Sequence, residues 1–253
     1  YEISTRDWSS DVCSSDLGKS VLPDHLYAGT QQEMQEDAIY FSDLIKQLQR
    51  IDTTTLSASK KTDYDLQLWT ATTRLDGTRF YDNIFPPVTP YAGYIYGLET
   101  IFKQASFEEP ADGDKYLKLL NEFGTVQQSY LNKLRWMESK GLRLAKPQIQ
   151  MTLGLIKSWQ VAPERHFLYP TAARLKKWTV ADQQKLQQEA GKILLEKILP
   201  QQDSLANFLK GTYLIKASDK VGLAQYPGGK EYYRYLVKYF TTADRTPEEM
   251  FAL

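Results

Sequence analysis

Apolar residues recur at helical spacing along most of this chain. In the first such stretch they stand at steps of four and three, which places them on one face of a helix. These positions are Met34, Ala38, Phe41, Ile45 and Leu48. Thr30 with Glu33 predicts a capping box at the start of this helix. The spacing returns at residues 64–75 and predicts a second helix.

The clearest helical stripe lies between residues 116 and 137. Its apolar members are Tyr116, Leu120, Phe123, Tyr130, Leu134 and Met137. Gln127 is the one polar position within the stripe. Gly141 suits the residue just past the end of this helix, and Pro147 can open the next one, which we expect over residues 148–160.

Further helices are predicted in the C-terminal half. Thr179 and Asp182 cap one of them, and Pro200 is predicted to end it. Residues 230–240 form another, and the face that carries Tyr232, Tyr235 and Tyr239 is interpreted mainly as core. Since no stretch alternates with period two, the pattern predicts an all-α fold of long antiparallel helices.

One long interruption, NIFPPVTPYAGYIYG at residues 83–97, contains three prolines and two glycines. We expect an irregular loop here, and its many aromatic and apolar residues favour packing against the helices. Two interpretations stay open. The loop plugs the helix bundle, or it forms one wall of a substrate cleft to which Tyr91, Tyr94 and Tyr96 offer ring faces and hydroxyls.

The first residues follow no structural period, and residues 7–17, DWSSDVCSSDL, resemble a translated sequencing-library adapter over all eleven positions. We therefore expect residues 1–17 to be a non-native, disordered leader. Residues 18–253 would then be the N-terminal helical part of a domain truncated at its C-terminus, since TPEEMFAL begins a helix and stops. A signal peptide before Gly18 would make the parent protein exported, either periplasmic or lipid-anchored.

Charge and composition exclude several classes of protein. The chain holds 31 basic and 31 acidic residues, and without residues 1–17 the balance is 30 to 27, or +3. This charge is too weak to indicate nucleic acid as a partner. The sequence contains no run of 18 apolar residues, the length that would indicate a transmembrane helix. Cys13, in the adapter-like stretch, is the single cysteine, so the rest of the chain cannot form disulfides or thiolate zinc sites.

The sequence contains no recognisable catalytic constellation. Its two histidines, His25 and His166, are far apart and lack the spacing that places two metal ligands on one helical face. A lone histidine beside proline is usually a surface residue or a loop anchor. Glu249 is best interpreted as the capping-box partner of Thr246. We therefore assign no catalytic residue, no metal ligand and no cofactor to these residues.

The segment YPGGKEYYRYLVKYFTTADRTPEEMFAL at residues 226–253 resembles a characteristic part of the bacterial DUF885 family. Three upstream segments resemble earlier helices of that family in the same order: LPDHLYAG, LQRIDTTTLSASKKTDYDL and DKYLKLLNEFGTVQQSYLNKLRWMESKGLRLAKPQI. The resemblance covers roughly residues 18–253.

The family is similar to gluzincin-like zinc metallopeptidases, in which a metal-bound water attacks a peptide carbonyl. The H-E-x-x-P-G-H motif of the family lies downstream of the TPEE helix, and its residues have no counterpart here. The resemblance thus implies zinc, a peptide substrate and a C-terminal catalytic half for the complete parent, with this chain as scaffold and cleft wall. A helical interaction module and a catalytically inactive relative remain the alternatives.

Overall fold

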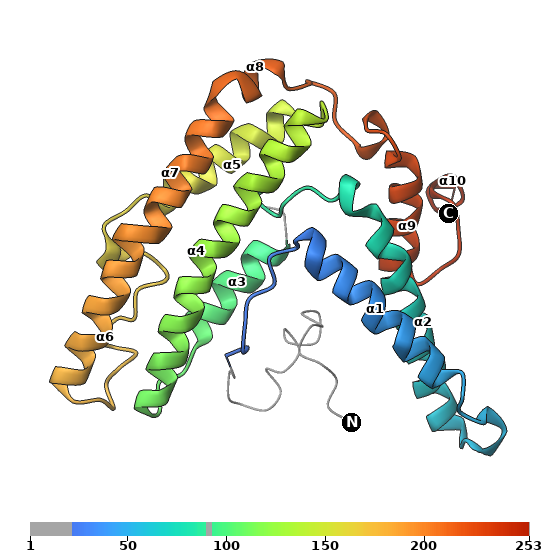
Figure 1. The fold of residues 1–253 in the computed structure, drawn as a ribbon, viewed down its shortest axis with the longest axis horizontal. Helices are drawn as coiled ribbons and strands as arrows, with labels where there is room; N and C mark the ends of the chain where they lie inside the picture. Colours follow the sequence, from blue (N-terminus) through green and yellow to red (C-terminus); the bar gives the residue numbers. More distant parts are fainter. Residues whose placement is uncertain (1–21, 90–92, 253) are drawn as a thin grey trace. The chain divides into compact units, whose positions relative to one another are not determined.

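The computed structural model describes residues 22–89 and 93–252, and over these residues the protein is helical without a β-strand (Figure 1). The predicted all-α class is therefore confirmed. The leader prediction for residues 1–17 lies outside the described residues.

The helices form two compact units, and each is assembled from separate parts of the chain. Unit 1 comprises Tyr1–Ala28 and Pro86–Asp219, and unit 2 comprises Gly29–Phe85 and Lys220–Leu253. The sequence predicts no domain boundary within residues 18–253. Because each unit is closed by segments far apart in sequence, no local change in composition marks its edges.

Unit 2 is built on a pair of packed helices, α1 (Gln31–Leu48) and α2 (Ala58–Gly77), joined by a turn that contains η2 (Thr53–Thr55). The predicted capping box is present, because the Thr30 hydroxyl accepts from the Glu33 N–H at 3.2 Å and the Glu33 carboxylate accepts from the Thr30 N–H at 2.7 Å. The other elements of unit 2 are η3 (Thr78–Asn83), η7 (Leu223–Gln225), α9 (Gly229–Thr241) and α10 (Pro247–Phe251).

The tyrosine face of α9 packs within unit 2. Phe80 packs against both Tyr232 and Tyr235, with ring-centroid distances of 5.3 and 5.1 Å. The Arg74 guanidinium lies over the Tyr239 ring at 5.6 Å. Burial raises the pKa of Tyr232 to about 12. The tyrosine face of α9 therefore packs against other residues of unit 2, while Tyr232, Tyr235 and Tyr239 each stay partly exposed.

Unit 1 is built around α4 (Pro110–Ser139), a helix of 30 residues. All six apolar positions of its predicted stripe are buried. Gly141 follows the helix with a φ of +79°, as its predicted place past the C-terminus requires, and Pro147 lies in the first turn of α5 (Lys146–Trp159). The other elements of unit 1 are α3 (Gly93–Gln104), η4 (Pro163–Arg165), α6 (Val180–Ile193), η5 (Leu194–Ile198), α7 (Leu199–Phe208), η6 (Leu209–Tyr213) and α8 (Leu214–Lys216).

Two sequence predictions about helix boundaries are wrong. Pro200 does not end its helix, because the chain widens into the π-helical turn η5 and the Leu199 N–H donates to the Leu194 carbonyl five residues back. The wider turn accommodates a proline that cannot donate a hydrogen bond. The irregular stretch is also shorter than residues 83–97, because η3 extends to Asn83 and α3 begins at Gly93. Burying Leu98 and Phe102 on α3 offsets the cost of helical glycine, about 1 kcal/mol per residue.

Candidate functional site

Unit 1 contains a narrow apolar cleft, which we call the unit 1 cleft. Its volume is about 30 Å³. Helices α3, α4, α5 and α7, the proline segment and the coil after α5 all contribute to it. Its described lining residues are Pro87, Val88, Leu98, Phe123, Gln127, Tyr130, Ile156, Trp159, Phe167 and Leu205.

Helical periodicity brings the floor of the cleft together. Phe123, Gln127 and Tyr130 follow one another on α4 at steps of four and three, so all three point from one face. Ile156 and Leu205 reach the same space from α5 and α7, and both are buried. The polar gap in the α4 stripe is therefore the polar part of the cleft floor.

The coil between α5 and α6 is fastened to the rest of unit 1, and this coil holds Phe167 at the cleft. The Tyr116 hydroxyl donates to the Leu168 carbonyl at 2.8 Å. The Arg174 guanidinium donates to the carbonyls of Phe102 and Ala105, at 2.6 and 3.0 Å. One side chain of α4 thus bonds to the main chain of the coil, and one side chain of the coil bonds to main-chain carbonyls at the end of α3 and just after it.

Gln127 is a buried polar group in the floor. The residue is 8% exposed, and within the described parts of the chain no group donates a hydrogen bond to its Oε1 atom. Most buried polar atoms in proteins have a partner, and leaving one unpaired costs roughly 1–3 kcal/mol. The cleft therefore presents a buried acceptor that needs a donor.

His166 lies behind one wall of the cleft. Its ring is 3% exposed and stacks on Phe167 at 4.7 Å. Its Nδ1 atom accepts from the Leu168 N–H at 3.2 Å, which assigns the proton of the neutral ring to Nε2. Burial lowers the pKa of His166 to about 4. Of the two histidines, His25 is exposed and His166 anchors a loop, in agreement with the structural interpretation of both.

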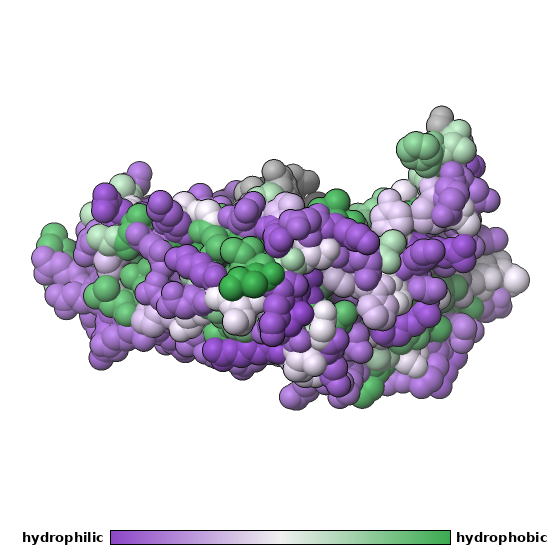
Figure 2. Space-filling view, turned by 90° about the horizontal axis from the view of Figure 1, so that it is seen from above, coloured by the Kyte–Doolittle hydropathy of each residue, from purple (hydrophilic) through white to green (hydrophobic). Residues whose placement is uncertain are grey.

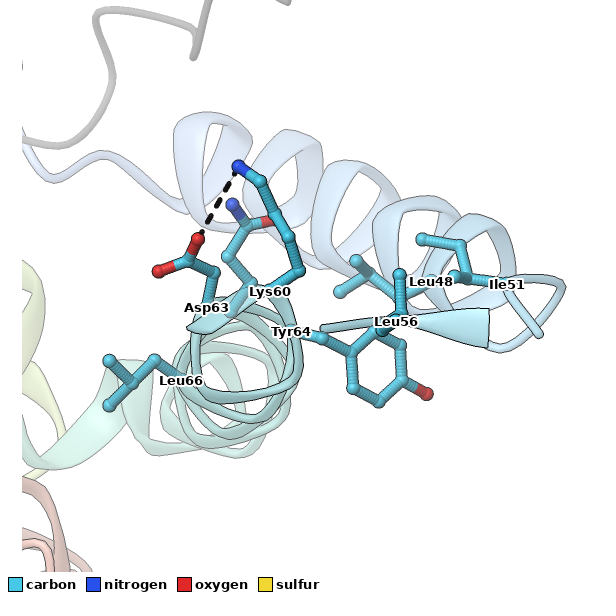
Figure 3. A pocket seen from close by; sticks show the side chains of 8 residues that line it. Leu48, Ile51, Leu56, Lys60, Asp63, Tyr64 and Leu66 are labelled. Carbon is cyan, nitrogen blue, oxygen red and sulfur yellow. Dashed lines mark ion pairs between the residues drawn. The ribbon is translucent and has the colours of Figure 1, made fainter. Parts of the chain in front are cut away.

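A second hollow lies in unit 2, at the turn between α1 and α2 (Figure 3). It is an open groove of about 410 Å³, lined by Leu48, Ile51, Leu56, Lys60, Asp63, Tyr64, Leu66 and Gln67. The ion pair between Lys60 and Asp63 spans 3.6 Å, and both side chains are largely exposed. Exposed ion pairs contribute little to stability or binding. Because the groove combines ordinary surface groups, we do not choose it as the candidate site.

Hydrophobic residues are also exposed singly on both units. In the face that Figure 2 shows, they form separate green patches among hydrophilic residues. The most exposed large ones are Phe251 at 94%, Ile215 at 77% and Phe240 at 76%. Isolated apolar residues are normal on protein surfaces.

The tyrosines predicted to line a substrate cleft are not tested by these contacts. Tyr91 lies outside the described residues. Tyr94 and Tyr96 belong to α3, and their side chains also fall outside the described part. Their neighbours in the segment do pack inward, since Pro86 and Val88 are buried and Val88 lines the unit 1 cleft.

The described residues do not offer a metal centre. Among residues 22–89 and 93–252, no three His, Cys, Asp or Glu side chains come close enough together to hold one ion. The sequence resemblance implies zinc for the complete parent, and the described residues of this chain lack the three protein ligands that a catalytic zinc site uses. In the same ranges, no helix is long and apolar enough to cross a membrane.

Comparison with known families decides the relationship. The family model described as "Bacterial protein of unknown function (DUF885)" matches residues 14–253. The chain belongs to the DUF885 family. The match starts inside the adapter-like stretch 7–17 and includes its last four residues.

A solved structure shares the fold of this DUF885 member. It is described as the putative lipoprotein from Colwellia psychrerythraea and superimposes with a TM-score of 0.78 at 13% sequence identity. The alignment covers 96% of this chain and 44% of that chain, so this DUF885 chain spans less than half the length of its solved neighbour. No curated protein matches the sequence.

Proposed function

We propose that this DUF885 chain is the helical, non-catalytic N-terminal portion of a longer zinc-dependent peptidase. One observation carries the proposal. Almost the whole chain matches the family, yet it spans 44% of its solved neighbour, and its described residues include no three-donor metal cluster. In this proposal, the catalytic metal centre lies in the other portion of the longer protein.

This portion would act as a structural scaffold. Long packed helices supply a rigid frame, and rigid frames hold binding residues more accurately than loops alone do. The unit 1 cleft, with a volume of about 30 Å³, would hold one small apolar group of a substrate, because apolar walls with few polar groups are typical of ligand sites. Its partners would be the catalytic half of the same protein and a peptide substrate.

Activity measurements on two proteins test this proposal. The longer protein should cleave members of a peptide library, and a zinc chelator should abolish the cleavage until zinc is restored. This chain alone should cleave none of them. If the longer protein cleaves no peptide and its metal ligands are replaced, it is an inactive relative. If this chain binds a partner unaided, it is an interaction module.

The predicted cleft tyrosines have their own test in the longer protein. We expect at least one of the single changes Tyr91→Phe, Tyr94→Phe and Tyr96→Phe to lower peptide turnover severalfold at unchanged stability, because each removes one hydroxyl and keeps the ring. Turnover and urea unfolding are measured side by side. If all three variants keep full turnover, or lose it only in step with stability, the tyrosines do not form a cleft wall.

A further inference from the structure

We propose that the unit 1 cleft binds an uncharged, apolar group that carries one hydrogen-bond donor, and that Gln127 Oε1 accepts from that donor. The inference goes beyond the proposed function. It concerns this chain alone and holds whether or not the longer protein is a peptidase.

The donor requirement comes from Gln127. Its amide belongs to the cleft lining, is more than nine-tenths buried and has an Oε1 atom without a hydrogen-bond partner in the described chain. The space beside it is about 30 Å³, enough for one or two groups of the size of a water molecule. A hydroxyl or an amide N–H fits that space, whereas a whole aromatic ring does not.

The uncharged character follows from the other walls. None of the ten described lining residues is charged, so an ionic ligand would lose its hydration without meeting an opposite charge. A nearby cation, Lys103, lies 6.0 Å from the Phe167 ring centroid, and it already pairs with Glu99 at 2.9 Å. The cleft therefore selects against ions.

The apolar body of the ligand would rest at the mouth of the cleft. Pro87, Trp159 and Phe167 are partly exposed, while the other seven lining residues are buried. Aromatic rings at such an edge offer flat surfaces on which another ring or an aliphatic chain packs. The geometry thus combines a small polar floor with a wider apolar rim, and the N–H of an apolar peptide residue or a small aromatic alcohol matches both parts.

Phenol and anisole form a matched pair of small molecules for the test. They have similar rings, and anisole carries a methyl group in place of the donor hydrogen. Their dissociation constants for the full chain are measured by NMR titration, with benzoate as the charged comparison. We expect phenol to bind about fivefold more tightly than anisole, the equivalent of ~1 kcal/mol for one net hydrogen bond, and benzoate to bind more weakly than either.

Two variants and one control locate the effect. Gln127→Leu should bind phenol and anisole equally, because it removes the acceptor. Trp159→Ala should weaken both ligands and keep the preference for phenol, because it removes part of the rim. The control is Gln128→Leu, which changes the next residue, whose amide pairs with Asn132 at 2.9 Å, and it should keep the preference.

Three results would overturn the proposal. They are equal binding of phenol and anisole to the natural chain, a preference for phenol that survives in a folded Gln127→Leu variant, and the absence of saturable binding of both ligands. The last result would mean that the cleft takes water only.

Discussion

Replacing Gly229 with alanine is expected to unfold unit 2 at a markedly lower urea concentration, with a loss of about 3 kcal/mol or more. A Cβ atom at this position would lie 1.8 Å from the Leu223 carbonyl oxygen and 2.7 Å from the carbonyl carbon. Both are backbone atoms, so a side chain cannot rotate away to make room. The turn that carries Leu223 must move, and the start of α9 must move with it.

Hydrogen exchange followed by mass spectrometry reads this effect locally. In the variant, amides of α9 and η3 should exchange faster, because the tyrosines of α9 pack on Phe80. The matched control is Gly154→Ala in α5, where a new Cβ would meet no atom within 4 Å. It should raise stability by about 0.5–1 kcal/mol, as alanine is the better helix former. Equal unfolding midpoints for Gly229→Ala and the natural chain would contradict the packing described here.

Acidification is expected to destabilise unit 1 through His166. Burial lowers the pKa of this imidazole from 6.5 to about 4, so between these values the unfolded chain binds a proton that the folded chain excludes. Protonation therefore favours unfolding. The contribution is fully present above pH 6.5 and is lost as the pH falls toward 4, and a shift of this size corresponds to roughly 3 kcal/mol.

The comparison of two histidine variants isolates this contribution. Urea unfolding is measured at several pH values between 7 and 4 for the natural chain, His166→Gln and His25→Gln. His25→Gln should keep the full pH dependence, since His25 is exposed. His166→Gln should lose the part of the slope that lies between pH 6.5 and 4. If all three proteins show one slope, His166 does not titrate as its burial implies.

Local patterns predicted the helices of this DUF885 member well where a single apolar face is buried along the whole helix. The α4 stripe is an example, because only a helix places its six apolar side chains on one face that can be buried. The predictions that Pro200 ends a helix and that Gly93 lies in an irregular loop were wrong for one reason. Each disfavours a regular helix locally, but a wider helical turn in one case and burial of an apolar face in the other outweighs that cost.

The candidate site was harder to predict than the helices. Gln127 was visible as a polar gap in an apolar stripe, which is a usable signal for a buried polar group. The cleft itself is assembled from α3, α4, α5, α7 and two coils, and no local pattern brings such distant segments together. The burial of His166 likewise depends on long-range packing, so its lowered pKa could not be read from neighbouring residues.

Zinc content is the most direct test of the central claim that this chain is the non-catalytic part of a zinc-dependent protein. Both the longer protein and this chain are loaded with zinc, dialysed and examined by elemental analysis. We predict about one tightly held zinc ion in the longer protein and none in this chain, because a tight site needs three or four protein ligands. Stoichiometric zinc in this chain, or none in the longer protein, would contradict the account.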